Sequence, residues 1–135
     1  MPLLVDAGIL YALADRTDTW HAPSIEYLER VRPTLLAPVT VIPEAAYLVH
    51  TRLGAPAELG LIRGFLNREI AVEPLADADF SRAAALMATN PDLGFTDCTV
   101  VAMAERLALT TIATTDRRHF GRVRPRHTTH FVLVP

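Results

Sequence analysis

The stretch LLVDAGILYALA, residues 3–14, contains a short apolar run, an acid and then apolar residues at helical spacing. An apolar run without polar alternation is typical of a strand that is buried on both faces, as in parallel sheets. The stretch therefore predicts a buried strand at 3–5, a carboxylate at its end (Asp6), and a helix through 9–14. An acid at the end of a buried strand needs a structural or chemical reason.

The same alternation continues along the chain. Four further apolar runs predict strands, and five stretches of helical period predict helices after the first one. The strands are expected at 34–37, 70–74, 111–114 and 131–134, and the helices at 23–31, 40–54, 56–67, 77–89 and 95–108. Strands alternating with helices predict an α/β fold with a mostly parallel central sheet flanked by helices. No repeat or linker divides the chain, so residues 1–135 are expected to form a single domain.

Composition limits the class of protein. A chain of 135 residues with 50% hydrophobic residues can bury about two thirds of the surface that its unfolded form exposes. Its one cysteine, Cys98, cannot form an internal disulfide. No apolar stretch approaches the roughly 18 residues that a membrane helix needs. We therefore expect a cytoplasmic protein with no membrane partner.

Positive charge is concentrated near the C-terminus. The net charge is −2, yet residues 117–135 carry five arginines and no acid, while the remainder carries eight arginines and all fifteen acids. The chain has no lysine. Arginine suits bidentate contact with phosphate, although genomic base composition can also produce an all-arginine set. We expect at least one of Arg122, Arg124 and Arg126 to contact phosphate groups of a polyanion, the alternative being simple ion pairs with the acidic body.

Most of the acids lie in polar surroundings. Glu73 and Glu105 are interpreted as solvated charges, and Asp77 and Asp79 as helix-start acids that interact with the helix dipole. Asp92 is a doubtful candidate. Four acids have surroundings that do not explain them: Asp6, Glu44, Asp97 and Asp116.

Each of these four acids has a plain structural interpretation. Asp6, Asp97 and Asp116 could each be a helix N-cap, and Glu44 could be a first-turn acid. Together they suggest a site. Two of them end parallel strands, at the edge where open α/β sheets bind ligands. Asp97 shares a helix face with apolar residues, and Glu44 shares one with Leu48.

Several carboxylates in one crevice repel one another unless a cation neutralises them. Oxygen ligands without His or Cys at ligand spacing favour Mg²⁺ or Mn²⁺, ions that also accept substrate phosphate. This pattern indicates phosphoryl-transfer chemistry, in which a metal-activated water attacks phosphorus.

Four segments resemble the PIN domain, in particular the VapC ribonuclease toxins of toxin–antitoxin pairs. They read LLVDAGILYAL, APVTVIPEAAYLV, LGFTDCTVVAMAERL and IATTDRRHF, and they span nearly the whole chain. The resemblance implies a three-layer α/β/α fold and a Mg²⁺- or Mn²⁺-dependent endoribonuclease. It also implies a homodimer that is inhibited by a cognate VapB-like antitoxin.

The resemblance assigns roles to residues. It places Asp6, Glu44, Asp97 and Asp116 on the catalytic positions, with Asp6, Asp97 and Asp116 as metal ligands. Thr114 falls on the hydroxyl residue that supports them. It further suggests an antitoxin groove near Leu13, Trp20 and Leu28.

One departure concerns the residues after the first acid, where the family often has a hydroxyl residue. Here Ala7 and Gly8 follow Asp6, so a hydrogen bond from that position is expected to be absent. The histidines are interpreted as surface or capping residues. A phosphoacceptor receiver-like module would need a lysine, and the chain has none. The remaining alternative is a catalytically weak PIN fold that binds RNA or a partner.

Overall fold

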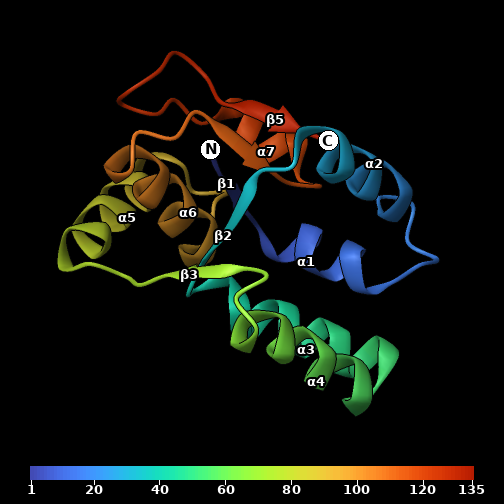
Figure 1. The fold of residues 1–135 in the computed structure, drawn as a ribbon. Helices are drawn as coiled ribbons and strands as arrows, with labels where there is room; N and C mark the ends of the chain where they lie inside the picture. Colours follow the sequence, from blue (N-terminus) through green and yellow to red (C-terminus); the bar gives the residue numbers. More distant parts are fainter.

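A computed structural model describes residues 1–135 as one central sheet with helices on both sides (Figure 1). All five strands run parallel, in the order β3-β2-β1-β4-β5. The strands are β1 (Pro2–Val5), β2 (Thr34–Pro38), β3 (Ala71–Glu73), β4 (Thr111–Ala113) and β5 (Val132–Val134). The parallel α/β fold expected from the sequence is confirmed.

The helices form two layers, with α5 and α6 on one side of the sheet and α1 to α4 packed together on the other (Figure 1). Their bounds are α1 (Ala7–Ala14), α2 (His21–Val31), α3 (Val41–Leu53), α4 (Ala55–Leu66), α5 (Asp77–Thr89), α6 (Phe95–Arg106) and α7 (Arg117–Arg122). No helix is long and apolar enough to cross a membrane.

The core explains why the strands read as continuous apolar runs. Leu4 of β1 and Ile112 of β4 are neighbours across the sheet and have no exposed surface. Val100 and Val101 of α6 are equally buried. Because helices cover both faces, successive side chains of a central strand all enter apolar surroundings.

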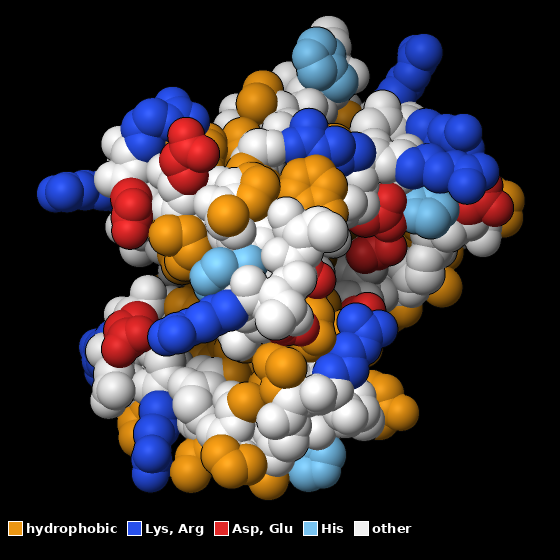
Figure 2. All heavy atoms as spheres, turned by 90° about the vertical axis from the view of Figure 1, so that its right-hand side faces the viewer, with side chains coloured by type: hydrophobic (Ala, Val, Ile, Leu, Met, Phe, Trp, Pro, Cys, Tyr) orange, Lys and Arg blue, Asp and Glu red, His pale blue; other side chains and the backbone are white.

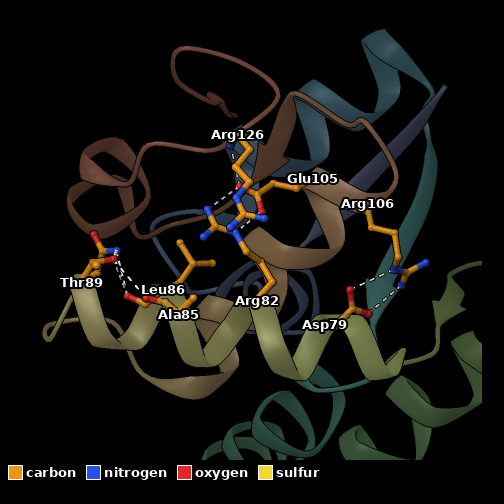
Figure 3. Close-up of polar contacts among 9 residues, drawn as sticks. Asp79, Arg82, Ala85, Leu86, Thr89, Glu105, Arg106 and Arg126 are labelled. Carbon is orange, nitrogen blue, oxygen red and sulfur yellow. Dashed lines mark hydrogen bonds and ion pairs between the residues drawn. The ribbon is translucent and has the colours of Figure 1, made fainter.

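Ion pairs join α5 to α6 on one side of the molecule (Figure 3). Arg82 donates two hydrogen bonds to Glu105, at 2.7 and 3.0 Å, and Arg106 donates two to Asp79, both at 3.0 Å. The side chains of Asp79 and Glu105 are only 2% and 9% exposed. The sequence interpretation of Glu105 as a solvated charge was therefore wrong, whereas Asp79 does lie in the first turn of its helix, as expected. Each is held by an arginine from the facing helix, and that pairing depends on tertiary contact.

Candidate active site

The sheet reverses its strand order at β1 and β4. From β1 the chain adds β2 and β3 on one side, and then returns to place β4 on the other. In open parallel sheets the carboxyl ends of the strands at such a point frame a crevice that binds ligands. Asp6 directly follows β1, and Asp116 lies just beyond β4. The fold therefore brings these two acids to the crevice.

Two helices add the other acids. Glu44 lies in the first turn of α3 and Asp97 in the first turn of α6. All four carboxylates line one pocket of about 190 Å³, together with small or uncharged residues: Ala7, Gly8, Val41, Leu48, Thr96 and Thr115. Figure 2 shows acidic side chains gathered around a hollow on one face of the molecule, with arginines on its rim. The expected convergence of Asp6, Glu44, Asp97 and Asp116 is observed, whereas their chemical roles stay predictions.

Asp6 is held at both of its oxygens. Its Oδ1 accepts from the backbone N–H of Ile9 at 3.0 Å, which makes it the N-cap of α1. Its Oδ2 accepts from the hydroxyl of Thr114, a residue with no exposed surface. The Thr114 oxygen accepts in turn from the backbone N–H of Asp116 at 2.9 Å. One buried hydroxyl therefore connects the first and last acids of the site.

Burial and mutual repulsion disfavour ionisation of two of the acids. Burial raises the pKa of Asp6 to about 6 against the hydrogen bonds from Thr114 and Ile9, with smaller contributions from Asp97 and Asp116. Burial also raises the pKa of Asp97 to about 6, together with the charges of Asp116 and Glu44. A pocket that resists holding its own negative charges is a pocket that gains from a bound cation.

Asp116 behaves differently because His119 supports it. Burial alone would raise its pKa, but hydrogen bonds from the backbone N–H and the imidazole of His119 outweigh burial and lower it. Those bonds join Oδ1 to the backbone nitrogen at 3.0 Å and Oδ2 to Nδ1 at 2.7 Å. Treating every histidine as a surface or capping residue missed this contact. The three-residue spacing from Asp116 into a helical turn was the available signal.

Helix capping and a place in the shared acidic site, the two interpretations offered for these acids, are both observed for Asp6 and Asp116. Asp6 and Asp116 cap α1 and α7 and also line the pocket, whereas Asp97 caps nothing, because the N-cap of α6 is Gly94. Asp97 is partly buried in the first turn of its helix without the hydrogen bond that a cap would have. Of these three acids, Asp97 is therefore the one whose position in the pocket is not explained by helix capping.

No three His, Cys, Asp or Glu side chains converge closely enough to form a ready-made metal centre. The donor set nevertheless fits a hard divalent cation, since it consists of carboxylate oxygens with hydroxyl groups beside them. Mg²⁺ usually keeps several water ligands and uses only one or two carboxylates directly. Such coordination requires less convergence than an all-protein cage.

Gly8 fits this site because it has no side chain. A Cβ at Gly8 would collide with the hydroxyl of Thr115 and approach Asp6 Oδ1 to 3.4 Å. A hydroxyl residue at position 8 could not be accommodated without moving Thr115. The space that a side chain at position 8 would need is occupied by the side chain of Thr115. Thr115 also lines the acidic pocket, so a hydroxyl group is still present there.

The three arginines that the sequence grouped do not lie together. Arg122 is exposed on α7 and lines a small pocket that also contains His119. The backbone N–H of Arg126 donates to Glu105 at 2.7 Å, in the last turn of α6 (Figure 3). Asp97 lies eight residues earlier on that helix, about 12 Å along its axis. Arg126 is thus placed towards the opposite edge of the sheet from the acids. Arg124 is exposed.

The predicted groove residues are also separated. Leu13 lines an apolar pocket of about 390 Å³ formed by α1, β2 and α4, together with Leu10, Leu35, Leu61 and Ile70. Trp20 and Leu28 are outside it. The guanidinium of Arg117 lies 5.3 Å from the centre of the Trp20 ring, and Leu28 packs against the core. An apolar groove exists beside Leu13, and the other two residues do not line it.

A parallel α/β sheet with acids gathered at its switch point defines a protein with an acidic, hydrolase-like site. The PIN domain family model matches residues 3–124, and the chain belongs to this family. It is 30% identical over 135 residues to the ribonuclease VapC26 of Mycobacterium tuberculosis, covering 98% of this chain and 100% of that protein.

Solved structures share the fold. The crystal structure of VapC20 from Mycobacterium tuberculosis, described as a toxin that cleaves the sarcin–ricin loop, aligns with a TM-score of 0.78 at 18% identity, over 87% of this chain and 92% of that one. The structure of VapBC2 from Rickettsia felis bound to promoter DNA aligns with a TM-score of 0.70 at 15% identity, over 98% and 97%. At these identities the likeness concerns the fold.

Proposed function

We propose that this chain is a Mg²⁺- or Mn²⁺-dependent endoribonuclease, and that it is the toxin of a toxin–antitoxin pair. The observation that carries the proposal is the gathering of four carboxylates in one pocket at the switch point of a PIN-domain sheet. The relationship to a ribonuclease over nearly the whole chain supports the choice of RNA as substrate.

Asp6, Asp97 and Asp116 are the residues that would hold the cation. When bound, a divalent ion would neutralise phosphate charge and acidify a water molecule. Thr114 keeps Asp6 turned towards the pocket, and His119 does the same for Asp116. Fixing each ligand through a hydrogen-bonded partner is a general requirement for metal affinity.

Glu44 has a separate role in this proposal. It is exposed and makes no side-chain hydrogen bond or ion pair within the protein, although it lines the same pocket. A carboxylate that is free of partners can accept a proton from a water molecule attacking phosphorus. Glu44 would therefore act as the general base.

Cleavage of RNA in the presence and absence of a chelator tests the activity. We expect cleavage with Mg²⁺ or Mn²⁺, and none with excess EDTA. Glu44→Gln should lower the cleavage rate roughly 100-fold or more while leaving metal binding, measured by calorimetry, nearly unchanged. Glu26→Gln is the matched control, because Glu26 is exposed on α2 and makes no side-chain hydrogen bond or ion pair within the protein. Binding of RNA without any metal-dependent cleavage would instead favour the alternative of a catalytically weak binding module.

The antitoxin is proposed as the partner of the apolar groove beside Leu13. Structural neighbours include toxin–antitoxin complexes, such as the VapBC2 complex. A groove lined mainly by hydrophobic residues suits the apolar face of a partner helix. A homodimer is part of the same proposal. Leu13→Asp should abolish binding of a VapB-like antitoxin from the same genome in calorimetry, whereas Leu66→Asp, exposed on α4 outside the groove, should not.

A further inference from the structure

A second pocket of about 170 Å³ adjoins the acidic one. It is lined by Thr89 at the end of α5, by residues 90–93 of the connection to α6, and by His119 and Arg122 of α7. His119 belongs to both regions, because its Nδ1 lies 2.7 Å from Asp116 Oδ2. A group bound in the second pocket would therefore lie one side chain away from the acids.

The lining of this pocket offers hydrogen-bond acceptors. The amide nitrogen of Asn90 already donates to the carbonyl of Leu86 at 3.0 Å and to Thr89 Oγ1 at 3.1 Å, so its carbonyl oxygen is the part that remains available. Asp92 is exposed and makes no hydrogen bond or ion pair within the protein. This explains why Asp92 had no evident structural role in the sequence. Its two carboxylate oxygens are both free to accept.

A pair of free acceptors selects a ligand with adjacent donors. Among the RNA bases, guanine alone presents two neighbouring donors on its Watson–Crick edge, N1–H and the N2 amine, which match a carboxylate bidentately. Adenine, cytosine and uracil each place at least one acceptor beside their single donor group. An ionised Asp92 repels those acceptors.

Arg122 adds a positively charged hydrogen-bond donor to the pocket, opposite in charge to Asp92. No carboxylate lies within ion-pair distance of its guanidinium. A free, exposed guanidinium matches a phosphate group geometrically and electrically. The pocket is smaller than the 300–1,000 Å³ typical of sites for drug-sized ligands, so it suits one base rather than a longer segment.

We propose that this second pocket is a subsite for a guanosine nucleotide of single-stranded RNA, next to the bond that is cut. Asp92 and Asn90 read the base edge, and Arg122 binds the phosphate of the same nucleotide. The inference rests on the proposed ribonuclease function, since it takes RNA to be the ligand. It adds a base preference, which that function does not specify.

The test uses fluorescently labelled oligouridines with one central guanosine or one central adenosine. Binding is measured by anisotropy in EDTA, and cleavage is measured separately with Mg²⁺. We expect the guanosine oligomer to bind about tenfold more tightly, and Asp92→Asn to remove that preference. Arg122→Ala should weaken binding of both oligomers alike and lower the slope of log affinity against log salt by roughly 0.7.

Asp77→Asn and Arg63→Ala are the controls, because they make the same charge changes on exposed parts of α5 and α4. Equal binding of the two oligomers by the wild-type protein, or a preference that survives Asp92→Asn, overturns the subsite. Metal-dependent cleavage without guanosine preference would overturn it while leaving the proposed function intact. Guanosine-selective binding without cleavage would support the subsite and count against the ribonuclease.

Discussion

Thr114 carries two hydrogen bonds that hold the site together, although it has no charge of its own. Removing its hydroxyl leaves Asp6 Oδ2 and the N–H of Asp116 without these partners in a buried setting. We expect Thr114→Val to lower the free energy of unfolding by about 1–3 kcal/mol in urea denaturation. Activity should fall as well, because Asp6 loses its orientation. Thr114→Ser keeps the hydroxyl and should retain most of the activity; equal losses in both variants would point to packing instead.

Asp97 is predicted to be needed for activity although its charge lowers the stability of the metal-free protein. Its pKa is raised because burial and the charges of Asp116 and Glu44 disfavour ionisation. Asp97→Asn removes that repulsion at neutral pH, so the melting temperature of the metal-free protein should stay the same or rise while cleavage is lost. Asp77→Asn should change neither quantity. A variant that still cleaves RNA at the wild-type rate would rule out Asp97 as a metal ligand.

At the scale of single residues, the sequence predicted those acids whose position follows from the chain itself. Asp6 and Asp116 were found because each ends an apolar strand, and Asp97 because it interrupts an apolar helical face. The ion-pair partners of acids on helix surfaces could not be predicted from such local patterns. Glu105 looks like an ordinary helix-surface acid until α5 places Arg82 against it. Such pairs depend on the packing of helices, for which the local pattern contains no information.

The contact between α5 and α6 makes stability depend on pH. Burial tends to raise the pKa of Glu105, but hydrogen bonds from Arg82 and from the backbone of Arg126 lower it overall. A carboxylate with a lowered pKa stabilises the fold above its unfolded pKa, and this contribution disappears as the pH falls through the folded value. The contribution is therefore complete at neutral pH and is lost below about pH 4.5.

Glu105→Gln tests this dependence. We expect the variant to be less stable than the wild type at pH 7 by about 1–3 kcal/mol, because a charge-assisted pair is broken. The difference should shrink as the pH is lowered below 4.5, the ordinary pKa of a glutamate side chain. Glu26→Gln, at an exposed glutamate of α2 without an ion pair, serves as the comparison. A difference that stays constant from pH 7 to pH 3 would contradict the ion pair as its cause.

Helix α7 shows why one element escaped prediction. Its sequence, RRHFGR, is short and polar and contains a glycine, so it has no helical apolar stripe. What stabilises it is Asp116 at its N-terminus, which accepts from the backbone of His119, and the fully buried ring of Phe120. The longer helices were predicted to within a few residues because each presents a repeating apolar face. One buried side chain, Phe120, does not produce the repeating apolar pattern from which a helix is predicted.

Charge at the scale of the whole molecule can be tested with two arginines. Arg124 and Arg126 are both exposed and close in sequence, but Arg126 is anchored against the far end of α6. If the basic segment contacts RNA beside the acids, Arg124→Ala should lower the salt slope of RNA binding by roughly 0.7, and Arg126→Ala should leave it unchanged. Equal slopes in both variants and the wild type would indicate that these charges balance the acidic body.

The switch point between β1 and β4 also determines when the protein can become active during its synthesis. The acids are contributed by residues that span positions 6 to 116, and β4 pairs directly with β1. A nascent chain that has released only β1 to β3 from the ribosome lacks both the strand that closes the crevice and the last acid. Because translation proceeds at about 5–20 residues per second, the interval between exposing Asp6 and Asp116 is several seconds or more. During that interval the ribosome carries a chain whose acidic pocket is not yet assembled.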